Sequence, residues 1–394
     1  MKSVSLCLLL VTFALGKNVH PYVAPEEQAA LNNKFNMDLF NYLLKDSKPN
    51  MVFSGFCLHK ILAMMSLGAR GETAAQLKKA LRLDDGTDQQ IKEGYKSFSD
   101  QMKEAKHLTM ETAIKAYVAE GLSLVPEMEK IATHYFDSGV ENVNFNKPEE
   151  TAAKINNWVE KETHHKIKNL ITEDNIGPLT RFILANTFYF KGDFQHPFDV
   201  SATKKDDFHI SKTETVQVDM MKLSASILTG VDSDIGVRMI TLPYRNKAAQ
   251  LAILLPDDID KTDAMENNIM KIWEARNLTR EYVEVHLPKF RVESSLDMIP
   301  ALKKMGVTQL FSNADLSGIV KNAEDIFVKT IKQKTFIDVN EIGTEAASAT
   351  FVDGVIRAGH IPRENPIVFK VNRPFVFGIL YDGVCLLAGK VHKL

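Results

Sequence analysis

The segment from Glu341 to Pro374 constrains the fold of this chain more than any other part of the sequence. Loops of more than about 15 residues without structure of their own are uncommon in compact domains. The first half of this segment nevertheless contains small and β-compatible residues in place of the proline, glycine and charge of a linker. Counted with the period of two of a β-strand, one face is small and uncharged and consists of Thr344, Ala346, Ser348, Thr350, Val352 and Gly354. The pattern predicts a loop that can enter a sheet as an additional strand.

The small residues of this segment begin directly after a glutamate. The residues concerned are Glu341, Gly343, Thr344, Glu345, Ala346, Ala347, Ser348, Ala349 and Thr350. This run resembles the hinge of the reactive-centre loop in the serpins, a family of protease inhibitors. In inhibitory members the hinge residues are small because the hinge must enter a sheet quickly after a protease has cut the loop. The resemblance therefore implies a protease inhibitor and not an enzyme.

Two further motifs extend the resemblance to the rest of the chain. Asn186, Phe190, Lys191 and Gly192 match a serpin pattern in the middle of the sequence, and the run Phe369–Phe377 matches one near its end. The resemblance covers residues 17–394 and shows neither repeats nor a linker. It implies an α+β fold: one serpin-type domain with three β-sheets, about eight or nine helices and an exposed reactive-centre loop at about residues 341–366.

In the family, a set of buried residues lies where the central sheet opens. The matching positions of this chain are Ser54, Cys57, Asn186, Phe194 and Gln333. Three of them depart from the usual pattern: Cys57 stands in place of a serine, Phe194 in place of a tryptophan and Gln333 in place of the histidine of many vertebrate members. We therefore expect the hydrogen bonding of this region to differ from that of its relatives.

The first 16 residues are typical of a secretory signal peptide. A lysine at position 2 is followed by an apolar run from Val4 to Leu15, which is too short to span a membrane, and Ala14 and Gly16 are small residues at the spacing that signal peptidase requires. We therefore expect a secreted, extracellular protein. Cys7 leaves with this peptide, and the two remaining cysteines, Cys57 and Cys385, are expected to be buried free thiols.

Composition and motifs exclude several other functions. The 394 residues are 45% hydrophobic and 25% charged with a formal net charge of −2, so neither a nucleic-acid partner nor a membrane is expected. The sequence has no nucleophile elbow, phosphate-binding glycine loop or zinc-binding helix motif, and we expect no cofactor and no metal site. The adjacent His164 and His165 are interpreted as surface residues. Asn277 begins the one N-glycosylation sequon, and a monomeric glycoprotein is expected.

The position of the scissile bond follows from the serpin resemblance. In the family the cut lies at a fixed distance after the hinge glutamate, and the seventeenth residue counted from Glu341 is Arg357. Seventeen residues span about 56 Å as a strand, enough to carry an attached protease across the molecule. The predicted reactive bond is therefore Arg357-Ala358, with Val355 and Ile356 in the flanking subsites. A count backwards from Pro374 favours Gly359-His360, and Arg363-Glu364 is a further rival bond.

The predicted target is a trypsin-like serine protease, because an arginine before the cut suits a primary pocket with a carboxylate at its base. A papain-like cysteine protease remains an alternative, since such enzymes often favour an apolar residue like Ile356 before the basic one. A non-inhibitory serpin is a third possibility. The absence of bulky residues and proline from the hinge argues against it.

Overall fold

The computed structural model describes residues 25–44, 49–177, 179–275, 277–321, 326–344 and 366–394. Within these ranges the chain forms nine α-helices and three β-sheets, and this confirms the expected α+β fold. The helices are α1 (Pro25–Leu43), α2 (Gly55–Gly68), α3 (Gly71–Ala80), α4 (Asp88–Glu104), α5 (Pro126–Phe136), α6 (Pro148–Glu162), α7 (Thr262–Asn267), α8 (Ile269–Ala275) and α9 (Ile299–Lys304). The predicted signal peptide lies outside the described residues. None of the helices in the described ranges is long and apolar enough to cross a membrane.

The largest sheet has nine strands, most of them antiparallel to their neighbours. The strands are β1 (Asn50–Phe53), β6 (Lys204–His209), β7 (Thr215–Asp232), β8 (Val237–Pro243), β9 (Ala249–Pro256), β10 (Thr279–Pro288), β15 (Ile367–Lys370), β16 (Phe375–Tyr381) and β17 (Val384–Val391). Their order is β1-β17-β16-β9-β8-β7-β10-β15, with β6 paired to β7. The run Phe369–Phe377 joins the edge strand β15 to the buried strand β16.

The six-stranded sheet contains the hinge residues Gly343 and Thr344. Its strands are β2 (Leu108–Ala119), β4 (Gly139–Val143), β5 (Phe182–Asp193), β11 (Phe290–Asp297), β13 (Val328–Val339) and the two-residue β14 (Gly343–Thr344). Their order is β11-β13-β14-β5-β2-β4, and β13 also pairs directly with β5. The short strands β3 (Ser123–Leu124) and β12 (Val320–Lys321) form the third sheet.

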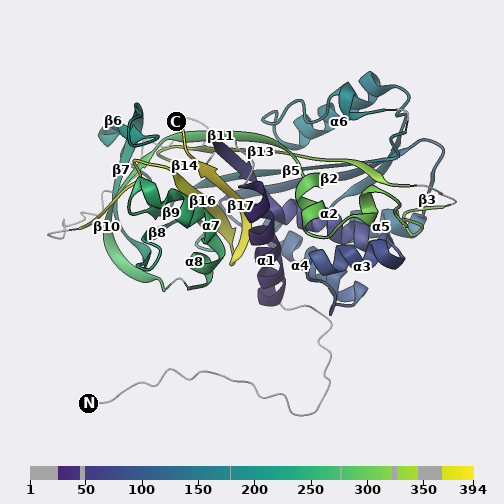
Figure 1. Cartoon of the computed structure of the whole chain (residues 1–394), viewed down its shortest axis with the longest axis horizontal. Helices are drawn as coiled ribbons and strands as arrows, with labels where there is room; N and C mark the ends of the chain where they lie inside the picture. The colour runs from purple at the N-terminus through teal and green to yellow at the C-terminus, as the bar shows by residue number, and fades with distance from the viewer. Residues whose placement is uncertain (1–24, 45–48, 178, 276, 322–325, 345–365) are drawn as a thin grey trace, which may run out of the picture.

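Helix α2 lies at the centre of the hydrophobic core. Every residue from Gly55 to Gly68 is buried, as expected of a helix that is predominantly apolar. The Ser54 side chain caps its first turn by accepting a hydrogen bond from the backbone N–H of Cys57. Figure 1 shows α2 on one face of the six-stranded sheet and α6 on the opposite face. The sheet is therefore covered on both sides.

A lysine is buried within α2, which the sequence pattern did not indicate. The Lys60 side chain is 1% exposed, and its Nζ donates to Ser99 Oγ at 2.9 Å and lies 3.8 Å from Asp137 Oδ2. Burial lowers the pKa of Lys60 to about 8, although the nearby Asp137 carboxylate acts in the opposite direction. The folded protein thus carries a charge in its core at neutral pH.

We expect Lys60→Met to raise the free energy of unfolding at pH 7 by roughly 1–3 kcal/mol, because methionine removes the cost of burying that charge. The lysine of the unfolded chain titrates near 10.5, so between about pH 8 and 10.5 the unfolded state binds more protons than the folded state. The wild type therefore gains stability over this range, and the advantage of the variant should shrink. Urea denaturation at pH 7, 9 and 10 measures this, with the exposed Lys79→Met on α3 as control. An advantage of the variant that is independent of pH would contradict the prediction.

Candidate functional site

Strands β5 and β13 are paired over only part of their length. They run parallel, and their register extends from Val328 opposite Phe182 to Gln333 opposite Asn186. Beyond this point β14 enters between them from the other end of the sheet, with Thr344 opposite both Gly192 and Val339. The sheet therefore contains a slot, bounded by β5 and β13, whose entrance is occupied by the first two strand residues of the hinge.

The absence of a side chain at Gly343 makes this entry possible. A Cβ atom on Gly343 would lie 2.1 Å from the carbonyl oxygen of Gly192 and 2.8 Å from the Cα of Asp193. Only glycine allows so close an approach of two backbones. Backbone hydrogen bonds then hold the entry in place, because the N–H of Phe194 donates to the carbonyl of Ile342 at 2.8 Å.

The side chain of Thr344 points into the core beside two aromatic rings. It is 1% exposed, and its Oγ1 lies 2.6 Å from the hydroxyl oxygen of Tyr244. The ring of Phe194 is stacked on Tyr244, with centroids 5.2 Å apart and an interplanar angle of 16°. The structure thus places the predicted Phe194 at the entrance of the slot. The sequence analysis missed Tyr244, and only its position directly after the β8 strand could have indicated it.

The hinge glutamate is held by two residues that the sequence analysis also missed. The carboxylate of Glu341 is largely buried, lies 3.1 Å from Lys289 Nζ and accepts a hydrogen bond of 3.0 Å from Thr203 Oγ1. Burial by itself raises the pKa of Glu341. The hydrogen bonds to the carboxylate and the charge of Lys289 outweigh this effect and lower it. Glu341 is therefore an ionised anchor for the start of the loop.

Four of the five residues predicted at the sheet-opening region form one hydrogen-bonded cluster. Gln333 accepts from the N–H of Ser54 at 2.8 Å, and its amide donates to the Ser54 carbonyl at 2.8 Å and to Asn186 Oδ1 at 2.5 Å. The Ser54 hydroxyl donates to the Leu386 carbonyl at 2.8 Å, and the Cys57 thiol lies 3.5 Å from the Thr187 carbonyl. The cluster links α2 to β5 and β13 at the point where their pairing stops. Phe194 lies apart from it, at the entrance of the slot.

Two buried hydroxyl groups beside the slot have no hydrogen-bond partner among the described residues. They belong to Thr187 on β5 and Thr335 on β13, and both side chains are fully buried. Each lies one or two residues beyond the last directly paired positions, Asn186 and Gln333. A buried hydroxyl without a partner costs about 1–3 kcal/mol. This part of the sheet is therefore less stable than a fully paired sheet.

Helix α6 and the chain that follows it cover the slot on the outer face. Phe336 of β13 is 6% exposed and belongs to a hydrophobic cluster with Ile155 of α6 and Ile167. Lys334 donates from Nζ to the Lys168 carbonyl at 2.6 Å. Directly after α6, His164 and His165 have positive φ angles, and each imidazole pairs with a separate carboxylate, of Glu111 and Glu160 respectively. A strand that fills the slot must pass beneath this cover.

Some of the remaining predicted residues lie outside the described ranges, and others are placed by the structure. The hinge residues Glu345–Thr350, the flanking residues Val355 and Ile356 and the predicted reactive bond Arg357-Ala358 lie outside the described residues. Asn277 is exposed and lies two residues before β10. Both remaining cysteines are free and buried, as expected, and burial raises the pKa of each thiol to about 12.

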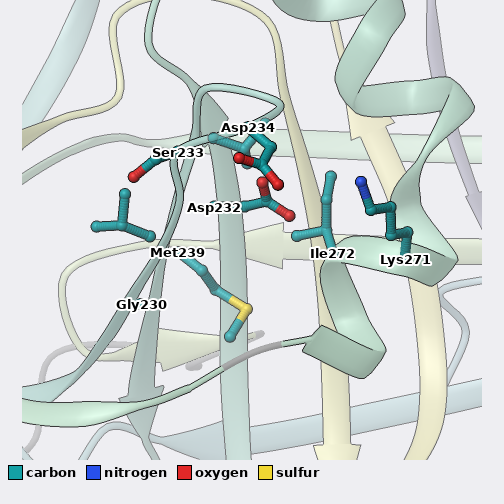
Figure 2. Close-up of a pocket in the computed structure, with 9 residues that line it drawn as sticks. Gly230, Asp232, Ser233, Asp234, Met239, Lys271 and Ile272 are labelled. Atoms are coloured by element: carbon teal, nitrogen blue, oxygen red, sulfur yellow. The ribbon is translucent and has the colours of Figure 1, made fainter.

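One pocket between the β7–β8 turn and α8 combines several polar side chains. Figure 2 shows the carboxylates of Asp232 and Asp234 near Ser233, with Ile272 and Lys271 on the opposite side and Met239 below. None of the described residues that line this pocket is a histidine or a cysteine. The Ser–His pair of a serine hydrolase is therefore not found among the described residues of this pocket.

Comparison with known proteins agrees with this geometry. Residues 30–394 match the model of the family described as serpin (serine protease inhibitor). Antichymotrypsin-2 of Bombyx mori is 32% identical over 367 residues, which is 92% of this chain and 96% of that protein. Leukocyte elastase inhibitor of Bos taurus is 35% identical over 369 residues, covering 90% and 95%. The crystal structure of Serpin48 from Tenebrio molitor superposes with a TM-score of 0.88 at 35% identity, covering 95% of this chain and all of that one. The chain belongs to the serpin family, and its relatives include proteins named as protease inhibitors.

Gln333→Leu tests the contribution of the sheet-opening cluster. We expect this change to lower the free energy of unfolding by about 2–4 kcal/mol, because it leaves the N–H and carbonyl of Ser54 and the Asn186 side chain without their partner. The midpoint of urea unfolding measures the loss. The exposed Gln89→Leu on α4 is the matched control and should shift the midpoint little. Equal midpoints for the two variants would show that the cluster is not stabilising.

Proposed function

We propose that the chain is a secreted suicide-substrate inhibitor of a trypsin-like serine protease, cut between Arg357 and Ala358. The observation that carries the proposal is that Gly343 and Thr344 already pair with β5 and β13 at the entrance of the slot. The inhibitors among its relatives give further support. The apolar run of residues 4–15 supports secretion, and the exposed sequon at Asn277 supports glycosylation. We propose a monomer acting on one protease molecule at a time.

The register of β14 supports this choice of bond. Thr344 lies opposite Gly192, and the two strands are antiparallel, so each further hinge residue moves one position back along β5. If this register continues, Gly354 comes opposite Phe182, which is the first residue of β5. Arg357 would then lie just past the end of the filled slot, at the opposite pole of the sheet. Arg363 would lie six residues farther on, where the sheet offers no partner strand.

The same register explains the small face of the hinge. Thr344 points into the core opposite Val339, so Ala346, Ser348 and Thr350 would point inwards as well. On β13 their opposite residues would be Ile337, Thr335 and Gln333 respectively. Ser348 could hydrogen-bond to the hydroxyl of Thr335, which has no partner among the described residues. Thr350 would arrive where Gln333 is bonded to Asn186 and would separate this pair.

In this proposal the protease catalyses the cleavage, and this chain determines how fast the hinge inserts. The protease serine Oγ attacks the carbonyl carbon of Arg357, the bond to the Ala358 nitrogen breaks, and the amine leaves with a proton from the protease histidine. Arg357 remains joined to the serine as an acyl-enzyme. Insertion of the hinge then pulls the protease to the far pole before water can hydrolyse the ester. Small side chains at Ala346–Ala349 make this insertion fast.

A papain-like cysteine protease is the second candidate target. The observation in its favour is Ile356, which places an apolar residue before the arginine. The thiolate of such an enzyme would form a thioester with Arg357 in the corresponding step. Inhibition assays against trypsin and against a papain-like enzyme distinguish the two candidates.

Incubation with trypsin tests the proposal directly. We expect a complex that survives denaturing electrophoresis and a released peptide that begins at Ala358. Thr344→Arg should abolish most of the complex and leave cleavage intact, because the buried site beside Tyr244 cannot accept an arginine. The control is Glu345→Arg, which changes the neighbouring residue on the outward face and should still trap protease. Clean cleavage of the wild type without a complex would indicate a non-inhibitory serpin.

Thr335→Val should stabilise the uncut state and destabilise the inserted state. Removal of a buried hydroxyl that lacks a partner should stabilise the uncut protein by about 1–2 kcal/mol. In the inserted state the same change removes the expected hydrogen bond to Ser348 and should slow insertion. We therefore expect a higher urea midpoint together with more protein consumed per trapped protease. A more stable variant that traps protease as efficiently as the wild type would contradict the proposed register.

A further inference from the structure

A pocket of about 360 Å³ lies between the chain that follows β5 and strands β7, β8 and β10. We call it the basic pocket, and six of its polar lining residues are Gln195, His196, Thr241, Lys247, Gln250 and Arg280. Its volume is at the lower end of the range for small-molecule sites. None of its described lining residues is an aspartate or a glutamate.

The side chain of Thr241 forms part of the wall of the basic pocket. It is 3% exposed, and it has no side-chain hydrogen bond within the described residues. Leu228 of β7 lies opposite both Thr241 and Arg280, so all three residues project from the same face of the sheet. A buried hydroxyl that lines a pocket without a protein partner is available to a bound ligand.

The charges of the pocket are not neutralised within the part of the chain that the structure describes. Lys247 is exposed and forms no ion pair there. Arg280 donates from Nη1 to the Ser226 carbonyl at 3.0 Å and has no carboxylate partner in the same ranges. The whole chain has 48 lysines and arginines and 50 aspartates and glutamates. The positive charge of this pocket is therefore local and does not reflect an excess of positive charge in the whole chain.

We infer that the basic pocket binds an oxyanion of the sulfate or phosphate type. The planar Arg280 guanidinium can donate two parallel hydrogen bonds to such a group, Lys247 adds a second charge, and the Thr241 hydroxyl donates from the wall. The anion could be free in solution or carried by a sulfated saccharide. Both sources present the same chemistry to the pocket.

The basic pocket is connected to the hinge through two short segments. The N–H of Gln195 donates to the Pro243 carbonyl at 2.8 Å, and both residues line the pocket. Their chain neighbours Phe194 and Tyr244 are the stacked rings at the slot entrance, and Tyr244 bonds to Thr344. An occupant of the pocket therefore contacts the two segments that hold the first hinge residues. The binding itself does not depend on any inhibitory activity.

Isothermal titration of the full chain at low salt tests the inference. The probes are sodium sulfate, inorganic phosphate and sucrose octasulfate. Saturable binding of the two small ions would identify a site for free anions, and binding of sucrose octasulfate alone would identify a site for a saccharide-borne sulfate. Either result supports the inference, and the affinity should fall as sodium chloride is added.

Three variants link the binding to the pocket. We expect Lys247→Ala and Arg280→Ala each to weaken binding by about tenfold, since each removes a charge-assisted contact. Thr241→Val keeps the shape of the buried side chain and should weaken binding by about threefold to tenfold. Lys79→Ala, on the exposed side of α3, is the matched control and should change affinity by less than about twofold. No saturable binding to the wild type, or an equal effect of all four variants, would overturn the inference.

Discussion

The incomplete pairing of β5 with β13 is the constraint on which the rest of this structure depends. These two parallel strands are paired only from Val328 to Gln333 on β13. Between Gln333 and the two residues of β14, the facing edges of β5 and β13 are not paired with each other. Backbone groups that are buried without partners are costly, and a strand that supplies them stabilises the sheet. The slot could therefore accept one more strand, as the proposed insertion of the hinge requires.

The elements around the slot keep it from filling at once. At the end of the slot where the β5–β13 pairing stops, Gln333 links Ser54 to Asn186. On the face covered by α6, Phe336 packs against Ile155 and Ile167. These contacts are local and individually modest, whereas a new strand would form a full ladder of hydrogen bonds on both sides. The loop insertion proposed above would have to break these contacts, so its rate would depend on them.

Much of this arrangement could be predicted from the sequence, because it rests on local patterns. The first two residues of the predicted hinge strand, Gly343 and Thr344, do pair in the sheet, and the motif residues Ser54, Asn186 and Gln333 do lie together. Residues that act through tertiary contacts were not predictable. Tyr244, Lys289 and Thr203 come from segments distant in sequence, and nothing in their own neighbourhoods marks them as partners of the hinge. The buried Lys60 was missed for the same reason, since its acceptors lie on other elements.

The substitution of phenylalanine at position 194 shows how the slot entrance accommodates a change of shape. A phenyl ring has no N–H group, so Phe194 can contribute only stacking, and it stacks on Tyr244. The polar contact to the hinge is then made by the Tyr244 hydroxyl, which meets Thr344. Because Tyr244 follows Pro243, whose carbonyl accepts from Gln195, the rings, the hinge and the basic pocket form one connected unit. A ligand in that pocket would act on the entrance through backbone contacts that do not depend on the residue at position 194.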